Sequence, residues 1–385
     1  MRTLTTTSEL ATFCKQAMTA PYVTIDTEFL RERTYYAQLC LVQIAYPGDG
    51  ENDAVLVDPL VDGLSLEPLY DLFRDESTVK VFHAARQDLE IFFHDAGVFP
   101  TPLFDTQVAA MVCGYGDQVG YETLVRSIAK KPLDKSSRFT DWSRRPLTEA
   151  QQTYAIGDVT YLRTIYEHLA KEIATSGRQS WVEEELTILT SKSTYEAHPE
   201  EAWKRVKTRN NSGRFMAIVA CLAEFRESYA QGRNIPRNRV FKDDAILELA
   251  STKPTDMKSL SRSRLLMRDG RKGAIADGIL AAVKKGVSMQ PEEYPPVPKT
   301  KDKIKPNPAI ADLLRVLLKA KCEEMDVASK LLASSAELDA LATGDKTVPA
   351  LHGWRYEVFG RDAERLCNGE IALSTKGRRV KVVAL

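Results

Sequence analysis

The sequence predicts an α/β domain in its first half, followed by two helical blocks. The first observation is a set of β-branched and apolar segments between residues 22 and 82, separated by short polar turns. The second is a change to basic, helix-patterned sequence after residue 178, and the third is the proline-rich segment 289–298. A chain of 385 residues is long enough for two or three domains. We expect these domains at residues 1–178, 203–287 and 303–385.

Four segments have the composition of β-strands: Tyr22–Leu30, Gln38–Ala45, Ala54–Asp58 and Val79–Phe82. The first three follow one another through short connections, which predicts an antiparallel meander. The fourth follows a helical pattern at Leu66–Phe73, and a strand reached through a helix is often parallel to a neighbour. The expected result is a mixed sheet with helices packed on it.

The remainder of this domain has helical periodicity. We expect helices at residues 83–94, 104–111, 121–130 and 147–174. Thr148 and Gln151 have the spacing of a capping box, so the last helix begins there. Asp105 stands where a helix opens, and we expect it to cap that helix.

Asp26 and Glu28 form the first candidate site. They lie two residues apart in a predicted strand, so both side chains project from the same face of the sheet. Two adjacent carboxylates repel each other and lose hydration when they are buried. Such a pair is stable only if it is protonated, paired with cations or bound to metal. Their hard oxygen atoms suit Mg²⁺ or Mn²⁺. The alternative is a strand end that reaches water, with Asp26 capping a turn.

Three further residues belong to predicted helices. Asp88 lies in the first turn of its helix, where the helix dipole also favours a carboxylate for purely structural reasons. Tyr154 and Asp158 are four residues apart and share one helix face. By itself, such a Tyr–Asp pair is commonplace.

Two basic regions indicate nucleic-acid binding. The first, residues 130–145, mixes Lys and Arg with Phe139 and Trp142, a combination that suits phosphates and stacked bases or a solvated loop. The second, residues 203–286, holds 19 Lys/Arg against 8 Asp/Glu, an excess of 11. It predicts a helical module with a basic surface, and a solvated charged face is the alternative. Its third helix is expected at residues 256–268, and the final block is expected to be helical from Pro308 to its end.

The composition excludes several protein classes. The formal net charge is zero, and the six cysteines contain no C-x-x-C pair, so neither a zinc site nor a disulfide framework is indicated. The first residues have no signal-peptide pattern, and no apolar run reaches the length of a membrane span. We expect a soluble cytoplasmic protein that does not associate with membranes.

Three motifs in order resemble the DEDD superfamily of 3′–5′ exonucleases, in its tyrosine-bearing subgroup. They read Ile25-Asp26-Thr27-Glu28, His83-Ala-Ala-Arg-Gln-Asp88 and Tyr154-Ala-Ile-Gly-Asp158. This resemblance covers about residues 1–175, and the two helical blocks are similar to HRDC modules. It implies a ribonuclease H-like exonuclease fold followed by two all-α HRDC-like domains. In the final block the resemblance is more distant and the sequence only weakly basic.

The resemblance also implies a mechanism and a site. Asp26, Glu28, Asp88 and Asp158 would bind two divalent ions, Mg²⁺ or Mn²⁺, and Tyr154 would orient the attacking water. Asp26 would bridge both ions, Glu28 and Asp158 would bind the ion on the nucleophile side, and Asp88 the ion on the leaving-group side. His83 is expected to be structural or close to the substrate rather than a metal ligand.

The implied activity is that of a 3′–5′ exoribonuclease that releases nucleoside 5′-monophosphates. The expected substrate is RNA with a single-stranded 3′ end, such as transfer-RNA precursors during 3′-end maturation, and the expected state is a monomer. One alternative is a 3′–5′ DNA exonuclease of repair, since HRDC modules also accompany DNA helicases. Another is a non-catalytic nucleic-acid-binding scaffold, in which the acids are structural.

Overall fold

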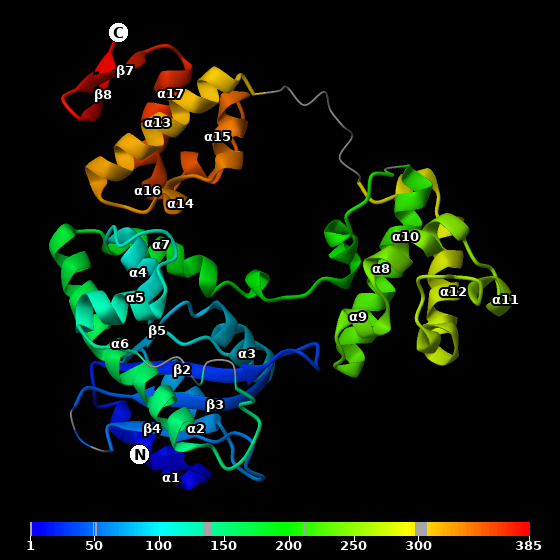
Figure 1. The fold of residues 1–385 in the computed structure, drawn as a ribbon, viewed down its shortest axis with the longest axis horizontal. Coiled ribbons are helices and arrows are strands. Elements are labelled where there is room, and N and C mark those ends of the chain that lie inside the picture. Colours follow the sequence, from blue (N-terminus) through cyan, green and yellow to red (C-terminus); the bar gives the residue numbers. More distant parts are fainter. Residues whose placement is uncertain are drawn as a thin grey trace. The chain divides into compact units, whose positions relative to one another are not determined.

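The structure is a computed structural model that describes residues 2–48, 50, 52–133, 137, 140–210, 212–296 and 306–385. Part of the predicted basic and aromatic stretch, including Lys135, Arg138 and Phe139, lies outside the described residues. The chain forms two compact units (Figure 1). The first unit comprises Met1–Glu28, Leu39–Thr194 and Lys303–Leu385, and the second comprises Phe29–Gln38 and Tyr195–Asp302.

Among the described residues, a six-stranded sheet forms the centre of the first unit. Its order is β1-β4-β3-β2-β5-β6. The strands are β1 (Arg2–Leu4), β2 (Tyr22–Leu30), β3 (Gln38–Ala45), β4 (Ala54–Val57), β5 (Val79–Phe82) and β6 (Leu103–Asp105). β3 and β4 are antiparallel, whereas β5 is parallel to β2 with Tyr22 opposite Val79. The predicted mixed sheet is therefore confirmed.

Helices cover both faces of this sheet (Figure 1). Helix α6 (Glu149–Ser176) lies on one face, where the Thr24 hydroxyl donates a 2.7 Å hydrogen bond to the carbonyl oxygen of Val159. Helices α2 (Glu67–Arg74) and α3 (Arg86–Ala96) lie on the other face, where the Phe73 ring packs 4.8 Å from the Phe92 ring. Because strand side chains alternate, Asp26 shares the α6 face with Thr24, and Thr27 shares the α3 face.

Five further helical segments complete the described N-terminal part of the first unit: α1 (Thr7–Ala17), α4 (Thr106–Val112), α5 (Tyr121–Leu124) with its π-helical continuation η1 (Val125–Ala129), α7 (Gln179–Leu189) and η2 (Lys192–Thr194). Two strands of this N-terminal part were not expected. β1 has only three residues, too few for a period-2 pattern, and it is held by parallel pairing with β4. Leu103–Asp105 forms β6 beside β5 before α4 begins, whereas the sequence predicts that the helix opens at Phe104.

The second unit is helical. It contains η3 (Pro199–Arg205), α8 (Gly213–Arg233), α9 (Arg237–Val240), α10 (Asp243–Thr252), α11 (Met257–Leu260), η4 (Arg268–Arg271), α12 (Gly273–Ser288) and η5 (Pro291–Glu293). α8 and α12 approach closely at Gly286, where an added Cβ would lie 2.6 Å from the Ile218 Cα. The predicted helix at residues 256–268 is wrong, since α11 ends at Leu260. The chain beyond it leaves the helix because the Glu248 carboxylate accepts the backbone N–H groups of Arg264 and Leu265.

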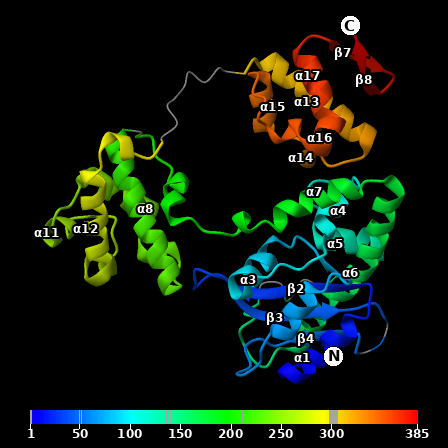
Figure 2. The ribbon, with the colours of Figure 1, turned by 180° about the vertical axis from the view of Figure 1, so that it is seen from behind.

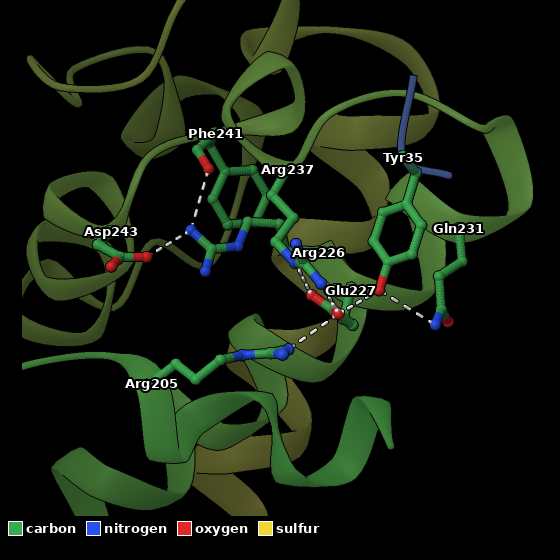
Figure 3. Close-up of polar contacts among 8 residues, drawn as sticks. All are labelled: Tyr35, Arg205, Arg226, Glu227, Gln231, Arg237, Phe241 and Asp243. Carbon is green, nitrogen blue, oxygen red and sulfur yellow. Dashed lines mark hydrogen bonds and ion pairs between the residues drawn. The ribbon is translucent and has the colours of Figure 1, made fainter. Parts of the chain in front are cut away.

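A segment from far away in the sequence completes the second unit. Residues 29–38 connect β2 to β3, and their Tyr35 hydroxyl donates to the fully buried carboxylate of Glu227 (Figure 3). The same carboxylate pairs with Arg237 at 2.5 Å and with Arg205 at 2.9 Å. The Arg237 guanidinium stacks 4.5 Å above the Tyr35 ring. Asn234 accepts the Tyr35 backbone N–H, so backbone and side chain together fix this loop in the second unit.

The final block folds within the first unit. Its elements are α13 (Pro308–Met325), α14 (Ser329–Leu332), α15 (Ser335–Ala342), η6 (Pro349–Leu351), α16 (Gly353–Arg355), η7 (Tyr356–Gly360), α17 (Arg361–Cys367), β7 (Ile371–Lys376) and β8 (Arg379–Ala384). The hairpin β7–β8 replaces the helical end that the sequence predicts, and both ribbon views place it beside α17 (Figures 1 and 2). Gly377, with φ +64°, permits the tight turn between the two strands, which pair from Ile371 opposite Ala384 to Lys376 opposite Arg379.

This block shares one hydrophobic core with the N-terminal part of the first unit. Residues of α4, α6 and α7 pack in one cluster with residues of α13 to α17. The rings of Trp181 and Trp354 stack with centroids 4.5 Å apart. Beside them, Glu185 accepts from the Trp354 indole N–H at 3.0 Å and pairs with Arg355 at 2.6 Å. The last 80 or so residues are therefore part of the packing that holds the N-terminal part together.

Within the described part of the chain, all six cysteines are free thiols. No helix in these described ranges is both long enough and apolar enough to cross a bilayer.

Candidate active site

Three of the predicted acids meet at one point of the first unit. Asp26 and Glu28 come from β2, and Asp158 comes from the α6 helix that lies on the same face. One carboxylate oxygen from each lies within 4.8 Å of the other two. Asp158 is buried, whereas Asp26 and Glu28 are half-buried. Residues 130 positions apart in the sequence thus form one acidic cluster.

This cluster concentrates negative charge in a poorly solvated place. Burial raises the pKa of Asp26 well above its ordinary value, and the carboxylates of Asp158, Asp88 and Glu28 raise it further. A divalent cation would relieve both effects, because it replaces lost hydration and neutralises the repulsion. Closely spaced carboxylate oxygens are the donors that Mg²⁺ and Mn²⁺ prefer. The residues present therefore fit such an ion.

Asp88 stands beside the cluster and not within it. It is buried in the first turn of α3, and its carboxylate accepts a hydrogen bond from the Thr27 hydroxyl. Its charge acts on Asp26, so the two carboxylates are near neighbours. Thr27 was not among the predicted site residues, because strand alternation places it on the opposite face of β2 from Asp26 and Glu28. The x position of the Asp-x-Glu motif was the available signal.

Tyr154 is placed by the N-terminal end of α6. Thr148 and Gln151 form the predicted capping box there, so the helix begins as expected. The indole of Trp142, which is 2% exposed, lies 6.0 Å from the Tyr154 ring. Arg145 holds the segment between them, since its guanidinium donates to the Trp142 carbonyl oxygen at 2.8 Å.

Arg145 also forms the strongest polar contact of this segment. It binds the Asp58 carboxylate through two nitrogens, at 2.5 and 2.7 Å, and donates to the Cys40 carbonyl oxygen at 2.7 Å. Asp58 directly follows β4, and Cys40 lies in β3. The segment before α6 is therefore fastened to the sheet that carries the acids, which fixes Tyr154 relative to them.

A cavity of about 330 Å³ opens next to the cluster. Asp26, Asp158 and Tyr154 line one part of it. Its other walls are His83, Ala84, Gln107, Gly120, Tyr121, Glu122, Thr123, Leu133 and Leu162. The size lies at the lower end of the range for small-molecule sites and suits one nucleotide.

Tyr121 connects this cavity to α6. Its buried hydroxyl group lies 3.0 Å from the carbonyl oxygen of Gly157 and 2.8 Å from that of Asp158. Burial raises the pKa of Tyr121 well above its usual range, with Asp158 and Asp26 adding to the effect, so the phenol stays protonated and donates. Tyr121 therefore holds the backbone of Asp158. Tyr121 was not among the predicted site residues, because its contact with α6 joins positions 36 and 37 residues apart in the sequence.

His83 and Asp105 organise the turn that leads to α3. The His83 ring contacts the Thr106 hydroxyl at 3.0 Å, and burial lowers the pKa of His83. Asp105 caps α4 as predicted, accepting from Gln107 N at 2.7 Å. It also accepts from the backbone N–H groups of Ala84 and Ala85, and so shapes the turn in front of Asp88.

Known proteins resemble this chain over its whole length. The family model described as 3′-5′ exonuclease matches residues 1–174, and the HRDC domain model matches residues 215–283. The chain is 65% identical to ribonuclease D of Jannaschia sp. (strain CCS1), over 99% of both chains. It is 46% identical to ribonuclease D of Granulibacter bethesdensis, over 99% of this chain and 96% of that one.

A solved structure agrees with these sequence relatives. The crystal structure of Escherichia coli RNase D, described as an exoribonuclease involved in structured RNA processing, matches with a TM-score of 0.82 at 30% identity. The match covers 96% of this chain and 98% of that one.

Proposed function

The chain belongs to the ribonuclease D family and is a 3′–5′ exoribonuclease, and on this premise we propose its mechanism, site and substrate. It hydrolyses RNA from the 3′ end by a two-metal-ion mechanism and releases nucleoside 5′-monophosphates. The observation that carries the proposal is the approach of Asp26, Glu28 and Asp158 within 4.8 Å of one another beside a nucleotide-sized cavity.

Each acid has a proposed role. Asp26 would hold both divalent ions, Mg²⁺ or Mn²⁺, and Glu28 and Asp158 would hold the ion on the nucleophile side with it. Asp88, whose carboxylate accepts a hydrogen bond from the Thr27 hydroxyl, would hold the ion on the leaving-group side, directly or through water. When bound, such ions generate a nucleophile from water and stabilise the leaving oxygen.

The remaining residues position the reactants. Tyr154 forms a hydrogen bond with the attacking water through its phenol hydroxyl and so orients it. Trp142 and Arg145 keep Tyr154 in place, and Tyr121 does the same for Asp158. The cavity beside them receives the 3′-terminal nucleotide and keeps bulk water away from it.

The proposed substrate is RNA with a single-stranded 3′ end. Within this class we propose transfer-RNA precursors. The proposed domains are the exonuclease domain at residues 1–178, a basic HRDC domain at 203–287 and a second HRDC-like domain at 303–385. We further propose that the protein acts as a monomer in the cytoplasm.

The test uses a 5′-labelled RNA stem-loop with a single-stranded 3′ tail, a matched DNA, and chelator. The intact protein should shorten the RNA stepwise from its 3′ end, and Asp26→Asn should abolish this. Asp62→Asn is the matched control, since Asp62 is an exposed acid of the same unit. Equal digestion of the DNA would favour a repair exonuclease, and activity that survives chelation would refute the metal mechanism.

Calorimetric titration with Mn²⁺ separates metal binding from activity. We expect two ions per chain in the intact protein, one in Asp88→Asn and none at the same concentrations in Asp26→Asn. Tyr154→Phe should keep both ions and lose about 10²-fold in kcat. A stoichiometry of one in the intact protein would contradict the two-metal mechanism.

A further inference from the structure

An exposed apolar loop interrupts the basic surface of the second unit. Residues Arg262–Arg268, here called the 262–268 loop, lie between α11 and η4 and include the first residue of η4. Leu266 at its centre is 1% exposed and anchors the loop in the core of the unit. Leu265 and Met267 on either side point outward and are 52% and 42% exposed. Two large apolar side chains are thus held in water next to one another in the chain.

The loop is rigidly built. The Glu248 carboxylate accepts from the Ser263 hydroxyl, from Arg264 N at 2.7 Å and from Leu265 N at 2.9 Å. From the other side, Arg271 Nε donates to the Leu266 carbonyl oxygen at 3.0 Å. These hydrogen bonds fix the backbone on both sides of the buried Leu266. The side chains of Leu265 and Met267 therefore stay exposed.

The charge around the loop is mostly positive, although the Glu248 carboxylate lies against its backbone. Between residues 257 and 272 the sequence holds six Lys/Arg and one acid, Asp269. Asp269 lies 4.0 Å from Lys272. Arg262, Arg264 and Arg268 are all exposed. A surface of this kind attracts a polyanion, while its apolar centre offers contact to something less polar than water.

We propose that the 262–268 loop is a docking site for the base-paired part of a structured RNA. The arginines contact phosphates on both strands, and Leu265 and Met267 lie against riboses in the minor groove, which is wide and shallow in A-form RNA. The proposal rests on the proposed function, because it assigns to the second unit the stem whose 3′ tail enters the active site. It predicts a preference for substrates with a stem over a tail alone.

The test measures binding by fluorescence anisotropy in chelator, so that no cleavage occurs. The probes are a labelled stem-loop with a 3′ tail and the tail alone. Two variants address the loop: Leu265→Ser with Met267→Ser, and Arg262→Gln with Arg264→Gln and Arg268→Gln. The control removes three other exposed cations of the second unit, through Arg239→Gln, Lys242→Gln and Lys284→Gln.

The serine variant should weaken stem-loop binding about tenfold with an unchanged salt dependence. The glutamine variant should reduce the slope of log Kd against log salt by roughly two to three. Neither should alter binding of the tail, and the control should change stem-loop binding less than twofold. All substituted side chains are exposed, so circular dichroism should show an unchanged fold.

Three results would overturn the proposal. Unchanged stem-loop binding would mean that the loop does not touch RNA. An equal loss in the control would mean that only overall charge matters. Loss of sedimentation with anionic phospholipid vesicles, with RNA binding retained, would assign the loop to a lipid surface. A denaturing gel of the probes after each titration shows whether they stayed intact in chelator. Shortened probes would count against the metal mechanism, whereas intact probes with unchanged binding would count against the docking site, so the two failures are distinguishable.

Discussion

Glu185 provides a direct test of the packing between the C-terminal block and the rest of the first unit. The residue belongs to α7, is 9% exposed, and accepts from both Trp354 and Arg355 of the C-terminal block. Glu185→Ala leaves the guanidinium of Arg355 and the indole N–H of Trp354 without their acceptor. We expect the free energy of unfolding to fall as a result.

The size of this loss follows from burial. Removing one partner of a buried ion pair costs about 3–5 kcal/mol. Arg355 keeps 14% exposure and a hydrogen bond to the Leu331 carbonyl oxygen, so we expect the lower end, about 3 kcal/mol. Glu185→Gln retains an acceptor and loses only the charge, which predicts a loss of about 1–2 kcal/mol.

Urea unfolding followed by tryptophan fluorescence measures the effect, because Trp181 and Trp354 stack beside Glu185. Glu183→Ala is the matched control, since Glu183 is an exposed acid on the same helix, and it should change stability by less than about 0.5 kcal/mol. A double-mutant cycle with Arg355→Ala isolates the pair. If Glu185→Ala behaves like the control, the shared packing does not exist in solution.

Three other predictions concern the acids. Thr27→Val should weaken binding of one Mn²⁺ and lower kcat about tenfold, because it removes the hydroxyl that hydrogen-bonds to Asp88. Thr27→Ser keeps a hydroxyl and should restore both properties. Equal Mn²⁺ titrations for the intact protein, Thr27→Val and Thr27→Ser would contradict this prediction. Without metal, Asp26→Asn should raise the melting temperature, because it removes charge repulsion from the acidic cluster. Added Mn²⁺ should no longer raise the melting temperature of this variant. Differential scanning calorimetry with and without Mn²⁺ measures both effects. Burial opposes ionisation of Glu227, but the hydrogen bonds from Arg237 and Tyr35 outweigh it and lower its pKa from 4.5 to about 2. Its contribution, about 3 kcal/mol, is thus present above pH 4.5 and lost as pH falls towards 2, so unfolding of Glu227→Gln should show a smaller loss over that range.

Local signals predicted local structure well. The capping box at Thr148 and the cap at Asp105 stand where the sequence placed them, because both depend on residues within three positions of each other. The helix expected at residues 256–268 failed for the opposite reason. The helix ends early because Glu248, a residue of α10, accepts the backbone N–H groups of Arg264 and Leu265 that a longer helix would use.

The sequence contains only a partial signal for the C-terminal hairpin. Arg379–Val382 alternates polar and apolar residues and Gly377 precedes it at the turn, but Ile371–Lys376 reads as three apolar residues followed by three polar ones, so only one of the two strands shows a period of two. Both strands have only six residues and follow a helical segment, so the sequence favoured a helix up to the end of the chain. β1 and β6 had no usable signal, since three residues cannot display a period and their formation depends on the strands beside them.

The sequence by itself determined which acids are available and on which elements they lie. Strand alternation set Asp26 and Glu28 on one face, and helix periodicity set Tyr154 and Asp158 on one side of α6. Tertiary structure alone decided that Asp158 joins the β2 pair while Thr27 holds Asp88 apart. It also decided that Tyr35 folds into the second unit and the C-terminal block into the first. The physical reason is that periodicity records neighbours along the chain, whereas these contacts depend on how separate elements pack.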